Sequence, residues 1–163
     1  MTIRPVRTFP DPCLKVVCVP VGEIDSAVMQ ICQDLAETMR THERCVGLAA
    51  PQLGIGLRIL ALDVSGHPKG AILNHGPLVL INPKITEGEG FEVGREGCLS
   101  LPDVTANVGR RRRIAFQALM PDGSLLRSVS AGFEARAIQH EVDHLDGILI
   151  LDRVASSSEI FRR

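Results

Sequence analysis

Residues 139–147 constrain the fold most strongly, because they contain the pattern His140-Glu141-Val142-Asp143-His144. Two histidines four residues apart share one face of a helix, so both imidazoles can bind one metal ion if this segment is helical. Glu141 lies beside that face. The pattern therefore predicts a metal-binding helix near the end of the chain, with the other elements arranged around it.

The nature of the remaining ligand separates the enzyme classes that use this pattern. A catalytic metal normally has three protein ligands and one open position. Metzincin proteases add a third histidine, but position 150 is Ile150 and no histidine follows His144. Thermolysin-type proteases take a glutamate from a later helix, and only Glu159 remains, in a short tail. The third ligand is therefore expected upstream.

Composition predicts one ordinary globular domain spanning residues 1–163, with 45% apolar and 23% charged residues. A net charge of -1 does not favour nucleic acid or an anionic membrane as the main partner. The five cysteines are odd in number and form no Cys-x-x-Cys pair, which is typical of reduced thiols. No signal peptide or membrane span is visible, so we expect a soluble cytoplasmic protein without membrane contact.

The first two thirds of the chain mix helix and strand patterns. Residues 25–41 form an apolar helical stripe capped by Asp25, and residues 45–52 are small and apolar up to Gln52. Strands are expected at residues 58–64 and 78–81. The polar loop between them contains His67 and His75, which we expect to be exposed.

Residues 95–100 form a second concentrated segment, and Cys98 lies in its glycine-rich part. A thiolate is a good metal ligand because it is soft and deprotonates on coordination. A small buried cysteine is the alternative interpretation of Cys98. The four other cysteines lie where packing explains them, so Cys98 is the leading third ligand.

The last third of the chain begins with four arginines at residues 110–113, which we interpret as a solvated edge rather than an RNA-binding patch. Strands at 114–120 and 125–129 flank a turn at 121–123. The metal helix is expected from Gly132 to Gly147, followed by a short strand at 148–151. Asp143 is interpreted either as an acceptor for a metal-binding histidine or as a solvated acid.

Three segments together resemble the peptide deformylase family: residues 47–52 (Gly-Leu-Ala-Ala-Pro-Gln), 96–100 (Glu-Gly-Cys-Leu-Ser) and 140–144. They occur in family order, and the resemblance covers residues 5–155. Two positions depart from the usual pattern. Cys45 replaces a common glycine, which is similar to the mitochondrial-type branch and is expected to reshape the substrate groove. Gly109 replaces a common proline, and a softer loop is expected there.

The resemblance implies an α+β fold in which short, mostly antiparallel sheets pack around the central metal helix. It implies one divalent ion held by Cys98, His140 and His144, with Fe²⁺ native and Zn²⁺, Ni²⁺ or Co²⁺ as substitutes. Glu141 would move the proton of the attacking water. The Gln52 amide and the backbone N–H of Leu99 would stabilise the oxyanion. Arg110 would pair with Glu96.

The implied substrate is a nascent polypeptide that begins with N-formylmethionine. Its main chain would add to an edge formed by Val46, Gly47 and Gly97. The methionine side chain would enter a pocket lined by Val46, Phe133 and Ala137, and helical spacing places the last two on the histidine face.

Partners and rival functions complete the expectations. A transient ribosome contact is in doubt, because residues 154–163 are shorter than the C-terminal helix that many bacterial deformylases use for it. One rival function is a metalloprotease of the same motif, which the missing downstream ligand disfavours. The other is a catalytically silent metal- or peptide-binding module, which the presence of Glu141 and Gln52 disfavours.

Overall fold

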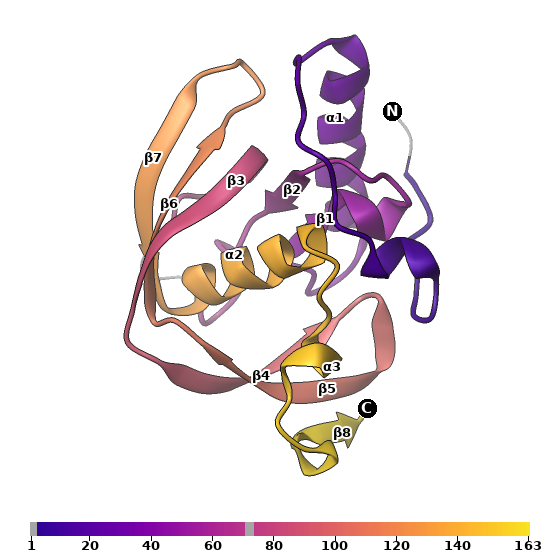
Figure 1. Cartoon of the computed structure of the whole chain (residues 1–163), viewed down its shortest axis with the longest axis vertical. Helices are drawn as coiled ribbons and strands as arrows, with labels where there is room; N and C mark the ends of the chain where they lie inside the picture. The colour runs from indigo at the N-terminus through magenta and orange to yellow at the C-terminus, as the bar shows by residue number, and fades with distance from the viewer. Residues whose placement is uncertain (1–2, 71–73) are drawn as a thin grey trace.

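Two antiparallel sheets enclose helix α2 in the computed structural model, which describes residues 3–70 and 74–163 (Figure 1). The five-stranded sheet has the order β1-β2-β3-β6-β7 and the three-stranded sheet the order β4-β5-β8. Helix α2 runs through the middle of the molecule between them. The expected α+β class, with mostly antiparallel sheets, is confirmed.

The elements have the following bounds. The larger sheet contains β1 (Gly47–Ala49), β2 (Ile59–Leu62), β3 (Leu78–Glu89), β6 (Arg113–Leu119) and β7 (Leu125–Ala131). The smaller sheet contains β4 (Glu92–Cys98), β5 (Leu101–Arg110) and β8 (Ile160–Arg162). The helices are α1 (Ser26–Thr41), α2 (Gly132–Leu145) and α3 (Ile150–Arg153), with short 3₁₀ turns η1 (Pro12–Lys15), η2 (Ala50–Leu53) and η3 (Ser157–Glu159).

Helix α1 forms where its apolar stripe and cap predict it. The side chain of Asp25 accepts a hydrogen bond from the N–H of Val28 at 2.9 Å, which satisfies a free donor of the first turn. Val28, Leu35 and Met39 are buried in one apolar cluster with residues of β1 and β2. The helix therefore covers the end of the larger sheet where β1 lies.

The hairpin of β6 and β7 also follows its sequence. Ile114, Phe116 and Ala118 alternate as buried residues along β6. Gly123 adopts φ of 83° in the turn, and its N–H donates to the carbonyl of Met120 at 2.9 Å. The strand and turn predictions for residues 114–129 are confirmed.

Helix α2 is buried along most of its length, with Ile138 and Leu145 fully enclosed. It ends at Leu145, where the guanidinium of Arg58 donates to the Leu145 carbonyl at 3.1 Å, and Gly147 has φ of 70°. The predicted metal helix is therefore present and two residues shorter than expected. Its histidine-bearing face turns toward β4.

Three segments differ from the sequence interpretation. Residues 148–151 were expected as a strand, but α3 begins at Ile150, because Asp152 accepts a hydrogen bond from the Leu149 N–H at 2.7 Å and caps the helix. Strand β3 continues to Glu89, well past residue 81. Gly109 lies within β5 and under the ring of Phe91. A Cβ added at this position would lie 2.7 Å from Cε2 of that ring, so the prediction of a softer loop is wrong.

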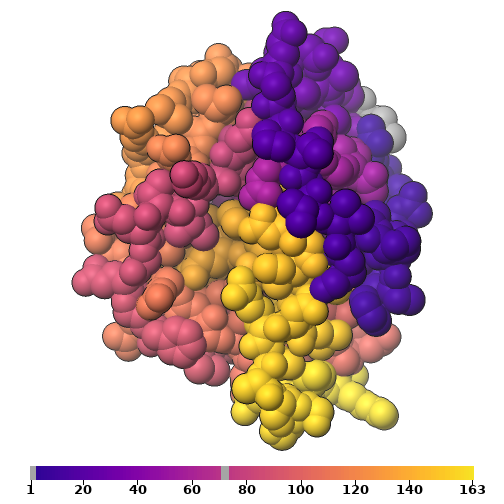
Figure 2. All heavy atoms as spheres, in the orientation of Figure 1, coloured from indigo at the N-terminus to yellow at the C-terminus, as the bar shows by residue number. Residues whose placement is uncertain are grey.

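The last ten residues add to the smaller sheet. After η3, strand β8 pairs antiparallel with Val104–Ala106 of β5. Figure 2 shows this C-terminal segment at the lower end of the molecule. None of the helices in residues 3–70 and 74–163 is long and apolar enough to cross a membrane.

Candidate metal centre

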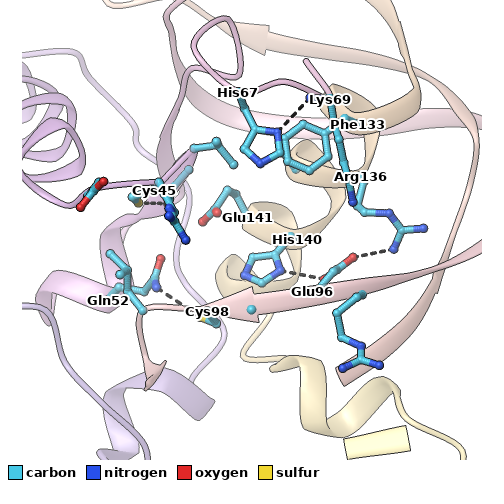
Figure 3. Close-up of a pocket in the computed structure, with 18 of the residues that line it drawn as sticks. Cys45, Gln52, His67, Lys69, Glu96, Cys98, Phe133, Arg136, His140 and Glu141 are labelled. Atoms are coloured by element: carbon cyan, nitrogen blue, oxygen red, sulfur yellow. Dashed lines mark hydrogen bonds and ion pairs between the residues drawn. The ribbon is translucent and has the colours of Figure 1, made fainter. Parts of the chain in front are cut away.

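Three side chains that could bind a metal converge where β4 meets α2. Cys98 is the last residue of β4, and His140 and His144 lie one turn apart on α2. Their ligand atoms all lie within 4.8 Å of one another, and the Cys98 Sγ is 3.3 Å from His144 Nε2. Figure 3 shows Cys98 and His140 beside the cavity. The structure thus brings together the three ligands predicted from the sequence.

The local backbone explains how Cys98 reaches the helix. The pairing of β4 with β5 shifts register between Gly97 and Cys98, and Cys98 then pairs with Leu101 across the turn. This shift ends the regular ladder at Cys98. The thiol is buried, with 6% of its residue surface exposed, and faces α2 rather than solvent.

A buried glutamate orients the first histidine. His140 Nδ1 donates to Glu96 Oε2 at 2.9 Å, which leaves Nε2 as the nitrogen available for a metal. Arg110 donates two hydrogen bonds to Glu96, both at 2.9 Å, and Arg136 donates a third at 2.8 Å. Although burial opposes ionisation, His140 and Arg110 hold the pKa of Glu96 well below its usual range. Glu96 is therefore a fixed anion behind the site.

Asp143 has neither of the two roles that the sequence left open for it. It is buried, and its carboxylate accepts hydrogen bonds from Arg110 at 2.5 Å and from Arg153 at 3.0 Å. It is neither a histidine acceptor nor a solvated acid.

Arg110 is also buried, so the solvated-edge interpretation is wrong for this arginine and confirmed for the exposed residues 111–113. The implied pair of Arg110 with Glu96 is present.

The donor set fits a divalent transition metal. One thiol and two imidazoles form the soft and borderline set that Fe²⁺ and Zn²⁺ accept. Burial raises the pKa of the Cys98 thiol, but the imidazoles of His144 and His140 outweigh it and hold the pKa well below its usual value. Two buried polar atoms beside this set, His144 Nδ1 and Glu141 Oε2, have no hydrogen-bond partner among the described residues. A cation with its bound water would supply a partner for the Glu141 oxygen, whereas His144 Nδ1 points away from the Nε2 that faces Cys98.

Glu141 lines the cavity beside the histidines, and burial raises the pKa of its carboxyl group. Gly47 of β1 packs directly against it. A Cβ atom on residue 47 would lie 2.8 Å from both Cγ and Cδ of Glu141. Glycine at this position therefore leaves room for the carboxylate next to the metal ligands.

Gln52 reaches the same site from η2. Its Oε1 accepts a hydrogen bond from the Ala49 N–H at 2.9 Å, which fixes the orientation of the amide. Its Nε2 lies 3.1 Å from the Ser100 hydroxyl and 3.6 Å from the Cys98 thiol. The amide N–H groups are thus directed toward the metal ligands.

A cavity of about 560 Å³ opens in front of these groups and lies between two sheet edges. Within the described sheets, β1 and β4 are both outermost strands, and both line the cavity. Its lining contains every site residue predicted from the sequence except the more deeply placed His144: Val46, Gly47, Gln52, Gly97, Cys98, Leu99, Phe133, Ala137, His140 and Glu141.

The cavity also contains residues that the sequence interpretation missed. His67 was expected to be exposed, but it is half-buried and its ring stacks on Phe133 with centroids 4.3 Å apart. Its position in a polar loop gave no signal for this contact. Arg136 could have been predicted as a cavity residue from the sequence, because it precedes His140 by one helical turn. His75 is exposed as expected, yet its Nδ1 donates to Glu134 at 2.7 Å.

Cys45 lines the cavity as well, and its Sγ donates to the Gly47 carbonyl at 3.1 Å. Burial, with a smaller contribution from the Glu141 charge, raises the pKa of this thiol to about 12. Cys45 is therefore a neutral thiol in the wall of the cavity. All five cysteines are free, as the sequence predicts for reduced thiols.

Comparison with known proteins agrees with this geometry. Residues 3–159 match the family model of polypeptide deformylases. A peptide deformylase from Dictyoglomus thermophilum is 44% identical over 156 residues, which span 96% of this chain and 95% of the relative. The crystal structure of peptide deformylase from Thermotoga maritima has 36% identity and a TM-score of 0.86, covering 96% of this chain and all of that one.

A second solved structure is a class I type b peptide deformylase from Acinetobacter baumannii with Met-Ala-Ser bound. It is 32% identical, with a TM-score of 0.85 over 94% of this chain and 99% of that chain. These relatives are bacterial, and a place for this chain in the mitochondrial-type branch stays a prediction.

Proposed function

The chain belongs to the polypeptide deformylase family, and from this premise we propose how its residues remove the formyl group from N-formylmethionyl nascent polypeptides. The convergence of Cys98, His140 and His144 within 4.8 Å, with Glu141 beside them, is the observation that carries the proposal. Each role below is assigned to a side chain by its contacts in the cavity.

Cys98, His140 and His144 hold one divalent metal ion, with Fe²⁺ as the native ion and Zn²⁺, Ni²⁺ or Co²⁺ as substitutes. When bound, this ion supplies a Lewis acid that polarises the formyl carbonyl and lowers the pKa of water toward neutrality. Glu96 fixes the ring of His140 from behind, which supports this ligand set.

Glu141 moves the proton during hydrolysis. Its carboxylate accepts a proton from the attacking water and then donates it to the amine that leaves. The raised pKa of its buried carboxyl group suits both steps, since the group must hold the proton between them. The glycine at position 47 supports the assignment, because it leaves space for the carboxylate.

Gln52 and Leu99 stabilise the charge that develops on the formyl oxygen. The Gln52 amide is held by the Ala49 N–H and directs Nε2 toward Cys98. The backbone N–H of Leu99 follows the metal-binding cysteine directly. Removing one such donor typically costs about 3 to 4 kcal/mol of transition-state stabilisation.

The substrate binds as an extended strand between β1 and β4. Both strands are outermost in their sheets, and Val46, Gly47 and Gly97 would supply backbone groups to a peptide in the cavity, although the Val46 carbonyl already accepts a hydrogen bond from the Asp63 N–H. The methionine side chain enters the space lined by Val46, Phe133 and Ala137. The Met-Ala-Ser complex of the Acinetobacter baumannii relative supports this choice of substrate.

We further propose that residues 1–163 act as one catalytic domain in the cytoplasm, without a membrane partner or a specific nucleic-acid partner. A transient ribosome contact remains part of the proposal, and residues 157–162, which form η3 and β8, would not supply a helix for it.

The test is to purify the protein without oxygen, load Fe²⁺, and measure formate release from formyl-Met-Ala-Ser alongside cleavage of an unformylated peptide. We expect formate release only. Glu141→Ala should keep the metal and lose at least about 100-fold in rate, whereas Glu92→Ala, an exposed change on β4, should alter neither.

Other outcomes identify the rival functions. New amino termini from the unformylated peptide would indicate a metalloprotease. Metal-loaded protein that binds peptide without releasing formate would indicate a silent binding module. A Cys98→Ser variant with unchanged Fe²⁺ affinity would remove Cys98 from the ligand set.

A further inference from the structure

The mouth of the cavity carries positive charge that the chain as a whole lacks. Most of the charged residues that line the cavity are basic: Arg44, Lys69, Arg95, Arg136 and Arg163, against Glu43, Glu96 and Glu141. Glu96 and Arg136 bind each other at 2.8 Å, and Glu141 belongs to the reaction centre. Four exposed basic side chains and one exposed acid, Glu43, then remain in a chain whose net charge is -1.

These four side chains are available to an outside anion. Within residues 3–70 and 74–163, no carboxylate forms an ion pair with Arg44, Lys69, Arg95 or Arg163. Their charges are therefore not neutralised by the protein itself. Lys69 lies beside His67 on one wall of the cavity, as Figure 3 shows.

Arg95 is held in position on the smaller sheet. Its Nε donates to Asn107 Oδ1 at 2.9 Å, its Nη1 donates to the Thr105 hydroxyl at 3.2 Å, and its guanidinium carbon lies 3.4 Å from the centre of the Phe161 ring. Glu159 accepts a hydrogen bond from Asn107 and forms no ion pair with Arg95. A guanidinium has five N–H donors, so Arg95 keeps free donors at the mouth. Because it is already ordered, binding an anion costs it little side-chain entropy.

Arg163 follows β8, on the far side of the smaller sheet from β4, and its side chain reaches across the sheet to Gly97. Its backbone N–H donates to the Asp103 carbonyl at 2.9 Å, and its guanidinium packs over Gly97. A Cβ on residue 97 would lie 3.0 Å from the guanidinium carbon, so glycine lets this flexible side chain lie over the strand. Arg163 and Arg95 thus flank the backbone of Gly97.

We propose that this basic mouth, defined as Arg44, Lys69, Arg95 and Arg163, selects formyl peptides with Asp or Glu in the two positions after formylmethionine. The inference rests on the proposed function, in which the peptide runs along β4 from Cys98. A strand advances about 3.3 Å per residue, so residue 95 lies about 10 Å along the strand from the metal ligand. The first two residues after methionine therefore pass between Arg163 and Arg95.

The experiment compares C-terminally amidated formyl-Met-Glu-Glu and formyl-Met-Gln-Gln, which differ only in side-chain charge. An exposed charge contact changes binding by a factor of about 1.4 to 5, so two contacts predict roughly a 2- to 25-fold preference in kcat/KM for the acidic peptide. The difference should appear in KM, with kcat unchanged. It should shrink between 50 mM and roughly 1 M salt, where the screening length falls to about 3 Å.

Variants assign the effect to residues. In the double variant Arg95→Gln with Arg163→Gln, the ratio of the two kcat/KM values should fall toward one. Arg127→Gln removes the same charge from an exposed position on β7 that does not line this cavity, and it should keep the wild-type ratio. A preference that survives in the double variant would contradict the assignment to these arginines.

The outcomes separate this inference from the function beneath it. Absence of formate release from either peptide would refute the proposed function. Equal kcat/KM for both peptides in the wild type would refute the basic mouth alone. Competitive inhibition by a short single-stranded RNA, without an acidic-peptide preference, would show that the charge serves RNA and would also overturn the proposal.

Discussion

Glu96→Gln tests how much of the metal centre depends on the anion behind His140. The carboxylate accepts four hydrogen bonds, two on each oxygen: Arg110 and Arg136 on Oε1, and Arg110 and His140 on Oε2. A glutamine has one acceptor oxygen, and its NH₂ group would face donors, so two of the four bonds are lost in either orientation.

The expected cost follows from those contacts. Hydrogen bonds to charged groups contribute about 1.5 to 3 kcal/mol each, and removing one member of a buried ion pair costs about 3 to 5 kcal/mol. Arg110 keeps its bond to Asp143, which does not change. We therefore expect a loss of about 3 to 5 kcal/mol in the free energy of unfolding, or roughly 6 to 20 °C in Tm for a chain of this length.

Metal affinity gives the second measurement. His140 would lose its fixed acceptor, and such changes typically weaken metal binding by about 10- to 100-fold. Titration of Co²⁺ against a competing chelator measures this directly, and thermal unfolding measures stability. Glu92→Gln, an exposed change on the same strand, serves as the control. A Glu96→Gln protein with wild-type Tm and wild-type metal affinity would refute the role of this network.

Three further predictions concern the cavity and its surroundings. Gly47→Ala should lower kcat by at least about 10-fold, because the new Cβ displaces the Glu141 carboxylate, and the overpacking should cost about 1 to 3 kcal/mol of stability, or roughly 2 to 12 °C in Tm; steady-state kinetics at wild-type rate would contradict this. His67→Ala should raise KM by about 2- to 12-fold through loss of the stack on Phe133, worth about 0.5 to 1.5 kcal/mol, and equal KM values would oppose it. Burial raises the pKa of Asp152. The Lys15 ammonium and the Leu149 backbone N–H donate hydrogen bonds to its carboxylate, and these lower the pKa below its usual value. A depressed folded pKa stabilises the protein above the unfolded pKa, and this stability is lost as pH falls through the folded value. Asp152→Asn should therefore cost about 0.5 kcal/mol at pH 7 after solvent screening, and in urea melts the difference should shrink below about pH 4 and vanish once the pH is below the folded pKa of Asp152; a difference that persists there would exclude the charge as its cause.

Local patterns in the sequence predicted the central elements of this fold. The spacing of His140 and His144 requires a helix, and α2 provides it. The alternation along residues 114–119 and the turn after them predicted the β6–β7 hairpin. These signals are local, because helix and strand periodicities depend only on neighbouring residues. No local pattern pairs Cys98 with the helix; the glycine-rich setting and soft thiolate of Cys98 made it the leading third ligand, and the family resemblance then implied the whole ligand set.

Interactions between distant segments could not be predicted in this way. Glu96 and His140 are separated by 44 residues, and only the fold brings the carboxylate to the imidazole. Asp143 pairs with Arg110 and Arg153, which likewise lie on other elements. At residues 148–151 a short apolar run fits strand and helix equally, and the cap by Asp152 decides for helix.

The two outermost strands at the cavity also bear on the solubility of the protein. An unpaired strand edge can join the edge of another sheet, which makes it a site of aggregation. Here β1 is only three residues long, and β4 faces it across the cavity, so neither edge is presented flat to a neighbouring molecule. A single extended chain end can enter where a second sheet cannot. The arrangement that admits a peptide terminus therefore also keeps these two edges from pairing with another sheet.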